Sequence, residues 1–254
     1  METRLTTIIP IIDSYHEELK QELIILQNYE PVHKDILIVV CDQFEYINAC
    51  IDSIYEHTKD FTLYIWDNGS QQQTASYLQN LKNVHYHRSD ENLGYIIPNN
   101  RLAVLGSSPY LILLNSDTIV LENWDKTMIS WLQMHPKIAA IGYGGSKLDQ
   151  DFHGGYPAWG YEADYVCGWS LTLRRNILNK FGLFDEEHLQ FAYGEDSDFC
   201  FRVREMGYQT YVMHLGLVEH FGNCTVVHFR DKLAPFFEAN HAYLKRKWFT
   251  SAHF

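Results

Sequence analysis

Basic residues are scarce in this sequence of 254 residues. Its 20 lysines and arginines face 32 aspartates and glutamates, so the formal net charge is −12 at pH 7. A protein this acidic repels the phosphate backbone of DNA and RNA, which argues against general nucleic-acid binding. An anionic substrate would need a metal ion or a local cluster of hydrogen-bond donors to offset that charge.

Long apolar runs are also absent. The longest, from Ile36 to Cys41 and from Tyr110 to Leu114, are far shorter than the roughly 20 residues that a membrane-spanning helix needs. The first residues include Glu2 and Asp13 in place of a basic segment followed by a long apolar one. We therefore expect neither a membrane span nor a signal peptide, and a cytoplasmic protein.

Paired cysteine motifs are missing as well. The five cysteines are odd in number and form no C-x-x-C pair, which indicates reduced thiols and not a disulfide framework. No repeat of fixed period and no low-complexity segment occurs. With 46% hydrophobic and 20% charged residues, the composition is that of a globular protein with a sizeable core.

Apolar runs and amphipathic segments alternate along the first half of the chain. Buried strands are expected at 36–41, 61–66 and 110–114, and a weaker extended segment at 84–87. Apolar residues at helical spacing lie between them, at 45–56, 74–81 and 99–105. This alternation predicts an α/β fold with a Rossmann-like, mostly parallel central sheet flanked by helices. An added helix from Tyr15 to Tyr29 precedes it, and Pro31 ends that helix.

Polar residues follow three of the expected strands, in Cys41-Asp42, Asp67-Asn-Gly-Ser70 and Asn115-Ser-Asp117. The carboxyl ends of parallel strands converge on the ligand crevice of such a sheet. A carboxylate there can accept a hydrogen bond from a nucleobase or bind a divalent cation through hard oxygen ligands. Each segment taken alone is equally typical of a tight turn or a helix cap.

The second half holds a cluster of acids in Glu195-Asp-Ser-Asp198. Carboxylates in the first turn of a helix are favoured by its dipole, and neighbouring carboxylates raise each other's affinity for a proton. The structural alternative is a capping cluster in which Asp198 pairs with Arg202 one turn further on.

The order of these segments resembles the family two nucleotide-sugar glycosyltransferases of the GT-A fold, in particular rhamnosyltransferase-like members. Four segments of the first half follow the family's order: the first strand with Asp42, a V-D-N-G-S-like segment at 66–70, an E-N-x-G turn at 91–94, and Asn115-Ser-Asp117 in the place of the D-x-D motif. Three segments of the second half come next: a G-x-x-x-x-x-R-R-like segment at 168–175, a G-x-F-D-E-like segment at 182–186 and an E-D-x-D-x-x-x-R motif at 195–202. The resemblance covers about residues 35–248.

The resemblance implies that the first half binds a nucleoside diphosphate sugar, with uracil or thymine as the base. Asp42 and Asp67 would hold the base and the ribose, and Asp117 would bind the Mn²⁺ or Mg²⁺ ion that bridges the two phosphates. The nucleotide-sugar site predicted in this way comprises Cys41, Asp42, Asp67, Asn68, Gly69, Asn92, Gly94, Asn115, Ser116 and Asp117.

The resemblance also assigns roles in the second half. Asp196 matches the general base that deprotonates the acceptor hydroxyl, Glu195 would orient the acceptor, and Asp198 stays structural. Gly168 and Trp169 join Glu195 in the predicted acceptor site. His220 follows the acidic motif where some relatives carry a metal-binding histidine, with His214 and His228 as lesser candidates. An imidazole beside a carboxylate suits Mn²⁺ better than Mg²⁺.

The predicted domain organisation follows from the same resemblance. Residues 1–34 form an N-terminal helical extension, 35–230 the GT-A domain and 231–254 a C-terminal helix. Within the GT-A domain, 35–120 form the nucleotide-sugar half and 142–230 the acceptor half. The family's small residues after the E-N-x-G turn are replaced here by Tyr95-Ile-Ile-Pro98, so we expect a tighter or differently aimed loop on the phosphate side.

The predicted function is metal-dependent, inverting transfer of one sugar to a hydroxyl of a glycan, lipid-linked or protein acceptor. Retaining GT-A enzymes share many of these elements, and the oligomeric state stays open. A sugar nucleotidyltransferase is a second candidate, but the Gly-rich, cationic loop of that class is missing from 41–45. A third is an inactive module that binds glycans or sugar nucleotides, against which Asp117 and the pair Glu195 and Asp196 argue.

The basic cluster at 245–247, next to Trp248, leaves two interpretations open. It could touch anionic lipid headgroups and place the protein peripherally at the inner face of a membrane. Alternatively, it is a solvated helix end whose cations complement the helix dipole.

Overall fold

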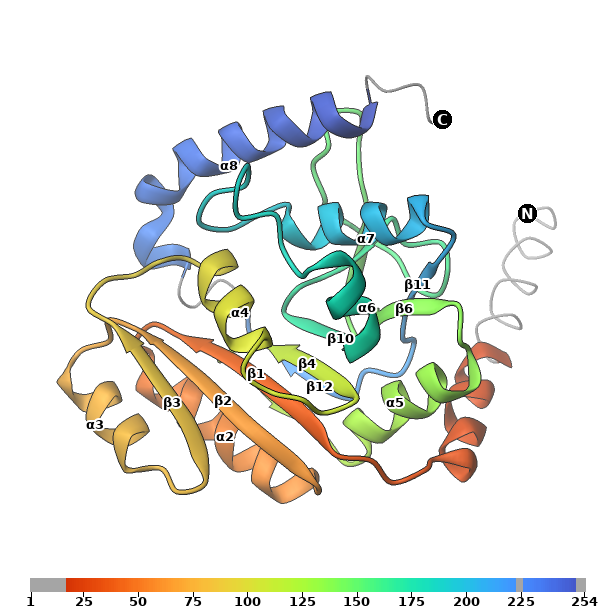
Figure 1. Ribbon diagram of the computed structural model, residues 1–254, viewed down its shortest axis with the longest axis horizontal. Helices are drawn as coiled ribbons and strands as arrows, with labels where there is room; N and C mark the ends of the chain where they lie inside the picture. The colour runs from red at the N-terminus through yellow and green to blue at the C-terminus, as the bar shows by residue number, and fades with distance from the viewer. Residues whose placement is uncertain (1–16, 223–225, 250–254) are drawn as a thin grey trace, which may run out of the picture.

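One mostly parallel sheet organises the protein. The computed structural model describes residues 17–222 and 226–249, and for 226–232 it describes the backbone alone. Strand β1 pairs in parallel with β2 and β4, whereas β10 is antiparallel to both β4 and β6 (Figure 1). In sheet order the strands are β11 (Gln209–Val212), β6 (Ile138–Gly142), β10 (Ser170–Arg174), β4 (Tyr110–Leu114), β1 (Lys34–Val40), β2 (Phe61–Asn68) and β3 (Val84–Ser89). The predicted α/β fold class is confirmed.

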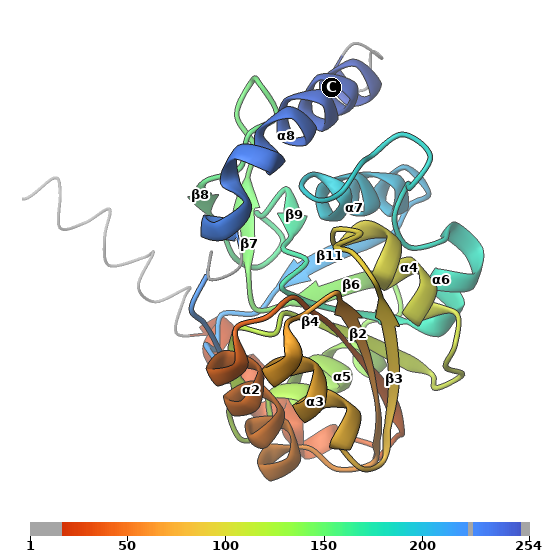
Figure 2. The ribbon, with the colours of Figure 1, turned by 90° about the vertical axis from the view of Figure 1, so that its left-hand side faces the viewer.

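Helices cover both faces of this sheet (Figure 2). One face packs against α2 (Phe44–His57), α3 (Gln72–Asn80) and α5 (Trp124–Met134). The other packs against α4 (Ile96–Ala103), α6 (Arg175–Phe181) and α7 (Glu195–Glu205). Along β1, Ile36 and Ile38 face the first layer and Leu37 the second. Such strands are buried on both sides, which explains why they read as continuous apolar runs.

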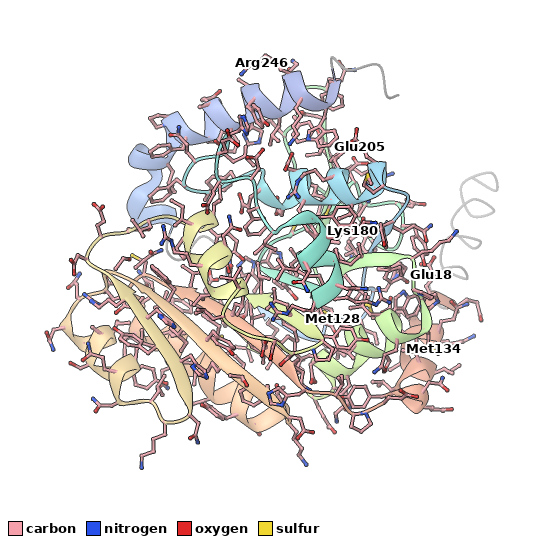
Figure 3. The ribbon with its side chains drawn as sticks, viewed as in Figure 1. Glu18, Met128, Met134, Lys180, Glu205 and Arg246 are labelled. Atoms are coloured by element: carbon pink, nitrogen blue, oxygen red, sulfur yellow. The ribbon has the colours of Figure 1, made fainter. Side chains whose placement is uncertain are left out.

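Side chains fill the space between the layers, as Figure 3 shows. Met128, which is labelled there, is completely buried between α5 and the sheet, and its sulfur accepts a hydrogen bond of 3.3 Å from the Thr172 hydroxyl on β10. The four cysteines among the described residues, Cys41, Cys50, Cys167 and Cys200, are all free thiols.

Two small sheets complete the architecture. Strand β5 (Thr118–Val120) pairs antiparallel with β12 (Val218–His220), which places His220 opposite Thr118. The second small sheet contains β8 (Tyr156–Pro157), β7 (Gly145–Lys147) and β9 (Tyr165–Val166). Strands of both small sheets end at loops that hold predicted site residues.

The N-terminal extension is helical over 17–24 and continues as the 3₁₀ helix η1 (Ile25–Asn28). The completely buried Glu22 fastens it to the link between β11 and β12. Its carboxylate accepts hydrogen bonds from the backbone N–H groups of His214 and Leu215 and pairs with the His214 ring, at 2.8 to 3.0 Å. Tyr15, where the predicted helix begins, lies outside the described residues.

Two helices begin earlier than the sequence pattern indicates. Helix α4 begins at Ile96 and not at Asn99, because a proline in the first turn, here Pro98, needs no hydrogen-bond donor. Helix α8 (Val226–Phe249) includes Pro235 and bends near its start (Figure 2). The predicted boundary at residue 230 therefore falls inside a helix.

The two predicted halves pack together in both hydrophobic core clusters, one on each face of the sheet. Arg175, at the start of α6, forms an ion pair of 2.6 Å with the buried Asp35 on β1, and the N–H and hydroxyl of Ser108 donate to the same carboxylate. Strand β10 from the second half lies between β4 and β6. None of the helices in 17–222 and 226–249 combines the length and apolar character that a membrane crossing requires.

Candidate active site

A cavity of about 310 Å³ lies at the carboxyl ends of β1, β2 and β4. All of the predicted site residues line it except Asp42, Asp67 and Gly69. Seven further residues without a predicted site role also line it: Val39, Tyr95, Cys167, Phe191, Ala192, Tyr193 and Leu233.

The predicted metal ligands Asp117 and His220 meet in this cavity. Asp117 follows β4, and the pairing of β5 with β12 brings His220 next to it, where Nε2 lies 3.2 Å from the Asp117 Oδ1. The Asn115 amide nitrogen lies 3.4 Å from the same imidazole nitrogen. The Trp169 indole stacks on the His220 ring at a centroid distance of 4.7 Å.

This pair suits one divalent cation. A carboxylate oxygen and an imidazole nitrogen are ligand types that such an ion accepts, and here they lie 3.2 Å apart. Within the described ranges, His, Cys, Asp and Glu side chains form no cluster of three or more suited to a metal.

The predicted catalytic pair opens helix α7. The Asp196 carboxylate accepts hydrogen bonds from the backbone N–H of Gly168, at 2.9 Å, and of Ser197, at 2.7 Å. Burial raises the pKa of Asp196, and burial together with the nearby Asp196 charge raises the pKa of Glu195. Hydrogen bonds to a carboxylate favour its charged form, so Asp196 is the member of this pair that ionises first.

Glu195 offers an unused hydrogen-bonding atom. Its Oε2 is buried and has no hydrogen-bond partner among the described residues, although Glu195 lines the cavity. A buried polar atom without a partner costs about 1–3 kcal/mol. A bound ligand hydroxyl at this position would satisfy it.

The loop before this pair has a rare backbone conformation. Phe191, Tyr193 and Gly194 have φ values of 63°, 78° and 88°, a left-handed region that aromatic residues seldom adopt. The buried Asn240 of α8 holds this loop: its amide nitrogen donates to the carbonyls of Gln190, Ala192 and Tyr193, and its oxygen accepts from the Gln190 N–H. The C-terminal helix thus helps to build the cavity wall.

The E-N-x-G turn packs directly on that loop. Gly94 has a φ of 82°, and a Cβ there would overlap the backbone of Phe191. The Asn68 amide donates to the Gly94 carbonyl at 2.7 Å, and the Asn92 side chain accepts from the Gly94 N–H at 2.8 Å. Asn68 and Asn92 therefore hold the turn as well as line the cavity.

Asp42 and Asp67 lie outside the cavity lining. The fully buried Asp67 accepts from the Ser70 N–H at 2.8 Å and the Tyr86 hydroxyl at 2.7 Å, and it also pairs with Arg88. Asp42 accepts from the Gln71 N–H at 2.6 Å. These carboxylates stabilise the turn after β2, so the predicted contact of Asp67 with a nucleobase has no support in this geometry; Asn68 and Cys41 face the cavity instead.

Asp198 has the structural role predicted for it. Its buried carboxylate accepts from Arg202 at 2.8 Å, Lys247 at 2.8 Å and the Trp248 indole at 3.0 Å. Lys245 forms an exposed ion pair with Asp151. Lys245 and Lys247 of the C-terminal cluster thus pair with the protein's own acids, which weakens the expectation of membrane contact.

We expect Asp198→Asn to destabilise the protein. It removes the buried charge that pairs with the half-buried cations of Arg202 and Lys247, which costs about 3 kcal/mol and lowers the melting temperature by roughly 6–12 °C. The exposed Asp151→Asn, which removes the partner of Lys245, is the control and should cost less than about 1 kcal/mol. Equal melting temperatures for the two variants, measured by thermal unfolding, would contradict this role.

The lesser candidate His214 does not line the cavity. His214 is bound between Glu18 and Glu22 at the N-terminal extension. The side chain of His228 lies outside the part of the chain that the structure describes.

Residues 35–182 match the family described as glycosyl transferase family 2. The chain belongs to this family. It is accordingly a glycosyltransferase, and the alternatives of a nucleotidyltransferase and a binding module lose their support. The comparison with curated proteins gives no significant match.

Solved structures show the same fold at low identity. The mannosyltransferase PcManGT from Pyrobaculum calidifontis, in complex with GDP-Man and Mn²⁺, is 13% identical with a TM-score of 0.59, over 94% of this chain and 79% of that one. Residues 1–349 of TarS from S. aureus are 15% identical with a TM-score of 0.54, over 71% of this chain and 57% of that one. This glycosyltransferase of family 2 therefore has the GT-A fold and spans little more than half of the TarS fragment.

Proposed function

We propose that this protein is a metal-dependent, inverting glycosyltransferase that transfers one sugar from a UDP- or dTDP-sugar to a hydroxyl of a glycan, lipid-linked or protein acceptor. One observation carries the proposal: Asp117 with His220, and Glu195 with Asp196, line the same cavity. Residues 35–120 supply the donor side of this cavity, and residues 142–230 supply its acceptor side.

The proposed reaction is a single displacement. Asp196 takes the proton of the acceptor hydroxyl as that oxygen bonds to the anomeric carbon from the face opposite the leaving group. The bond from the anomeric carbon to the phosphate oxygen breaks, and the nucleoside diphosphate leaves with the electron pair. Glu195, through its unused Oε2, hydrogen-bonds the acceptor and orients it.

Asp117 and His220 would hold the divalent cation, with Mn²⁺ favoured because an imidazole joins the carboxylate. When bound, that ion offsets the charge that develops on the diphosphate. The acidity of the whole chain increases this need. The complex of PcManGT with GDP-Man and Mn²⁺ supports the choice of metal.

The identity of the base remains a proposal from the sequence resemblance. TarS has been solved in complex with UDP-GlcNAc, in a match with a TM-score of 0.51, whereas PcManGT holds GDP-Man. The fold therefore accommodates both purine and pyrimidine donors. Asp67 accepts hydrogen bonds from Ser70 and Tyr86 and does not line the cavity, so the base is proposed to contact groups such as Cys41 and Asn68 that do line it.

We expect UDP and dTDP, but not CDP or GDP, to raise the melting temperature in the presence of Mn²⁺. A ligand at about 100 times its Kd stabilises the folded state by about 2.7 kcal/mol, which is a rise of roughly 5–10 °C for a protein of this size. EDTA should remove the effect. A shift with GDP alone, or one that EDTA leaves intact, would refute the proposed donor or the proposed metal, respectively.

The stereochemical half of the proposal needs its own measurement. Proton NMR of the first product formed from the active donor should show the anomeric configuration opposite to that of the donor. A product that keeps the donor configuration would replace the inverting mechanism with a retaining one, and would leave the donor assignment unaffected.

A further inference from the structure

Tyr95 is a lining residue to which the sequence analysis gave no role in the site. It is fixed at both ends: its backbone N–H donates to the Phe191 carbonyl at 2.6 Å, and its hydroxyl donates to the Gly168 carbonyl at 2.7 Å. The second bond joins the donor side of the cavity to the turn between β9 and β10. Tyr95 thereby crosses from one half of the site to the other.

Gly168 links Tyr95 to Asp196. Its carbonyl accepts from Tyr95, while its N–H donates to the Asp196 Oδ2 at 2.9 Å. A Cβ at Gly168 would lie 3.4 Å from the Tyr95 ring and 3.7 Å from the Asp196 Cβ, so the three residues are in close contact. The other N–H on the Asp196 carboxylate comes from Ser197, the next residue.

We propose that Tyr95 is a positioning residue for the catalytic base: by fixing Gly168, its hydroxyl keeps the Gly168 N–H aimed at Asp196. This inference rests on the proposed role of Asp196. A hydrogen bond to a carboxylate stabilises the ionised form, which is the form that can accept the acceptor's proton. Without the Tyr95 hydroxyl, the turn loses an anchor and the bond from Gly168 to Asp196 weakens.

The titratable neighbours of Asp196 are acids. Glu195 and Cys200 come from α7, Tyr165 and Cys167 from β9 and the turn after it, and Tyr95 from the segment before α4. Burial raises the pKa of Cys167, Cys200, Tyr95 and Tyr165, so these four are neutral near pH 7. Among these neighbours, Glu195 is the carboxylic acid whose pKa the Asp196 charge raises. A change in the Asp196 titration can therefore be attributed to its own hydrogen bonds once Glu195 is followed in parallel.

The test uses Tyr95→Phe in the full chain, with Tyr143→Phe as the matched control. Tyr143 is buried and, like Tyr95, donates to a backbone carbonyl at 2.7 Å, here that of Trp124, but it does not line the cavity. The side-chain carboxyl carbons are labelled with ¹³C and titrated by NMR. The Asp196 signal is assigned as the one missing in Asp196→Asn, and the Glu195 signal as the one missing in Glu195→Gln.

We expect the Asp196 titration midpoint to rise by roughly 0.5–1 pH unit in Tyr95→Phe, since one weakened hydrogen bond is being measured. Tyr143→Phe should leave it unchanged. With any nucleotide sugar that supports turnover, the acid limb of the kcat/KM profile should move to higher pH by the same amount, and kcat should fall about fivefold while the Kd of UDP with Mn²⁺ stays constant.

An unchanged Asp196 midpoint in Tyr95→Phe would overturn the inference. So would a weaker Kd for UDP with an unchanged pH profile, because Tyr95 would then act on the donor directly. The NMR titration needs no turnover, so it tests Tyr95 even where the proposed transferase activity fails. Absence of transfer by the wild-type protein would refute the proposed function alone.

Discussion

Asp196→Asn is expected to lower turnover by roughly 10²–10⁴-fold, the usual contribution of a positioned general base. The amide keeps the size of the side chain but cannot take the proton of the acceptor hydroxyl. Donor affinity should change little, because Asp117, His220 and the loops after β1 and β2 line the donor side. Steady-state transfer and calorimetric binding of UDP with Mn²⁺ measure the two quantities separately.

The pH dependence supplies a second readout for Asp196. Burial raises the pKa of Asp196, and a base must be deprotonated to act, so wild-type turnover should increase as the pH rises through that pKa. This increase of turnover with pH should disappear in Asp196→Asn. Asp198→Asn should instead lower the melting temperature and keep the increase of turnover with pH. Near-normal transfer by Asp196→Asn would move the search for the base to Glu195.

Asp117→Ala is expected to remove metal-dependent turnover, a loss on the order of 10³-fold or more. A divalent cation contributes several kcal/mol of charge stabilisation in such a site, and each 1.36 kcal/mol corresponds to about tenfold in rate. His220 alone would bind Mn²⁺ weakly. Titration of Mn²⁺ in the presence of UDP should show the lost affinity directly, without reliance on the acceptor.

The matched control for this prediction is Glu122→Ala, an exposed carboxylate just beyond β5. It should keep both the Mn²⁺ affinity and the melting temperature of the wild type. Full activity of Asp117→Ala, or of the wild type in excess EDTA, would disprove the metal assignment. Loss of the folded state in Asp117→Ala would be visible in its melting curve, and Asp117→Asn then provides the same test with less disturbance.

The sequence predicts the sheet well where strands are buried on both faces. Continuous apolar runs identified β1, β2 and β4, because helices cover both sides of these strands. The antiparallel strand β10 was not predicted. It is stabilised by pairing with β4 and β6, which are distant in sequence, and its own five residues carry no periodicity that indicates direction.

The candidate site was harder to predict than the sheet. Motif order identified most of the lining residues, but a strand-end segment does not reveal which of its side chains faces the ligand. Asp67 and Asn68 are adjacent, yet successive strand residues point to opposite faces, and only Asn68 reaches the cavity. Phe191, Tyr193 and Leu233 line it through loop and helix contacts for which the sequence offers no local signal.

The hydrogen bonds between Asn240 and the loop at 190–193 affect the order in which the parts of the active site form. That loop also receives hydrogen bonds from Tyr95 and Ile96, so segments from three distant parts of the chain must meet before it can adopt its left-handed backbone. Because α8 follows every strand of the sheet and α7 in the chain, the cavity wall is completed during synthesis only after α8 leaves the ribosome.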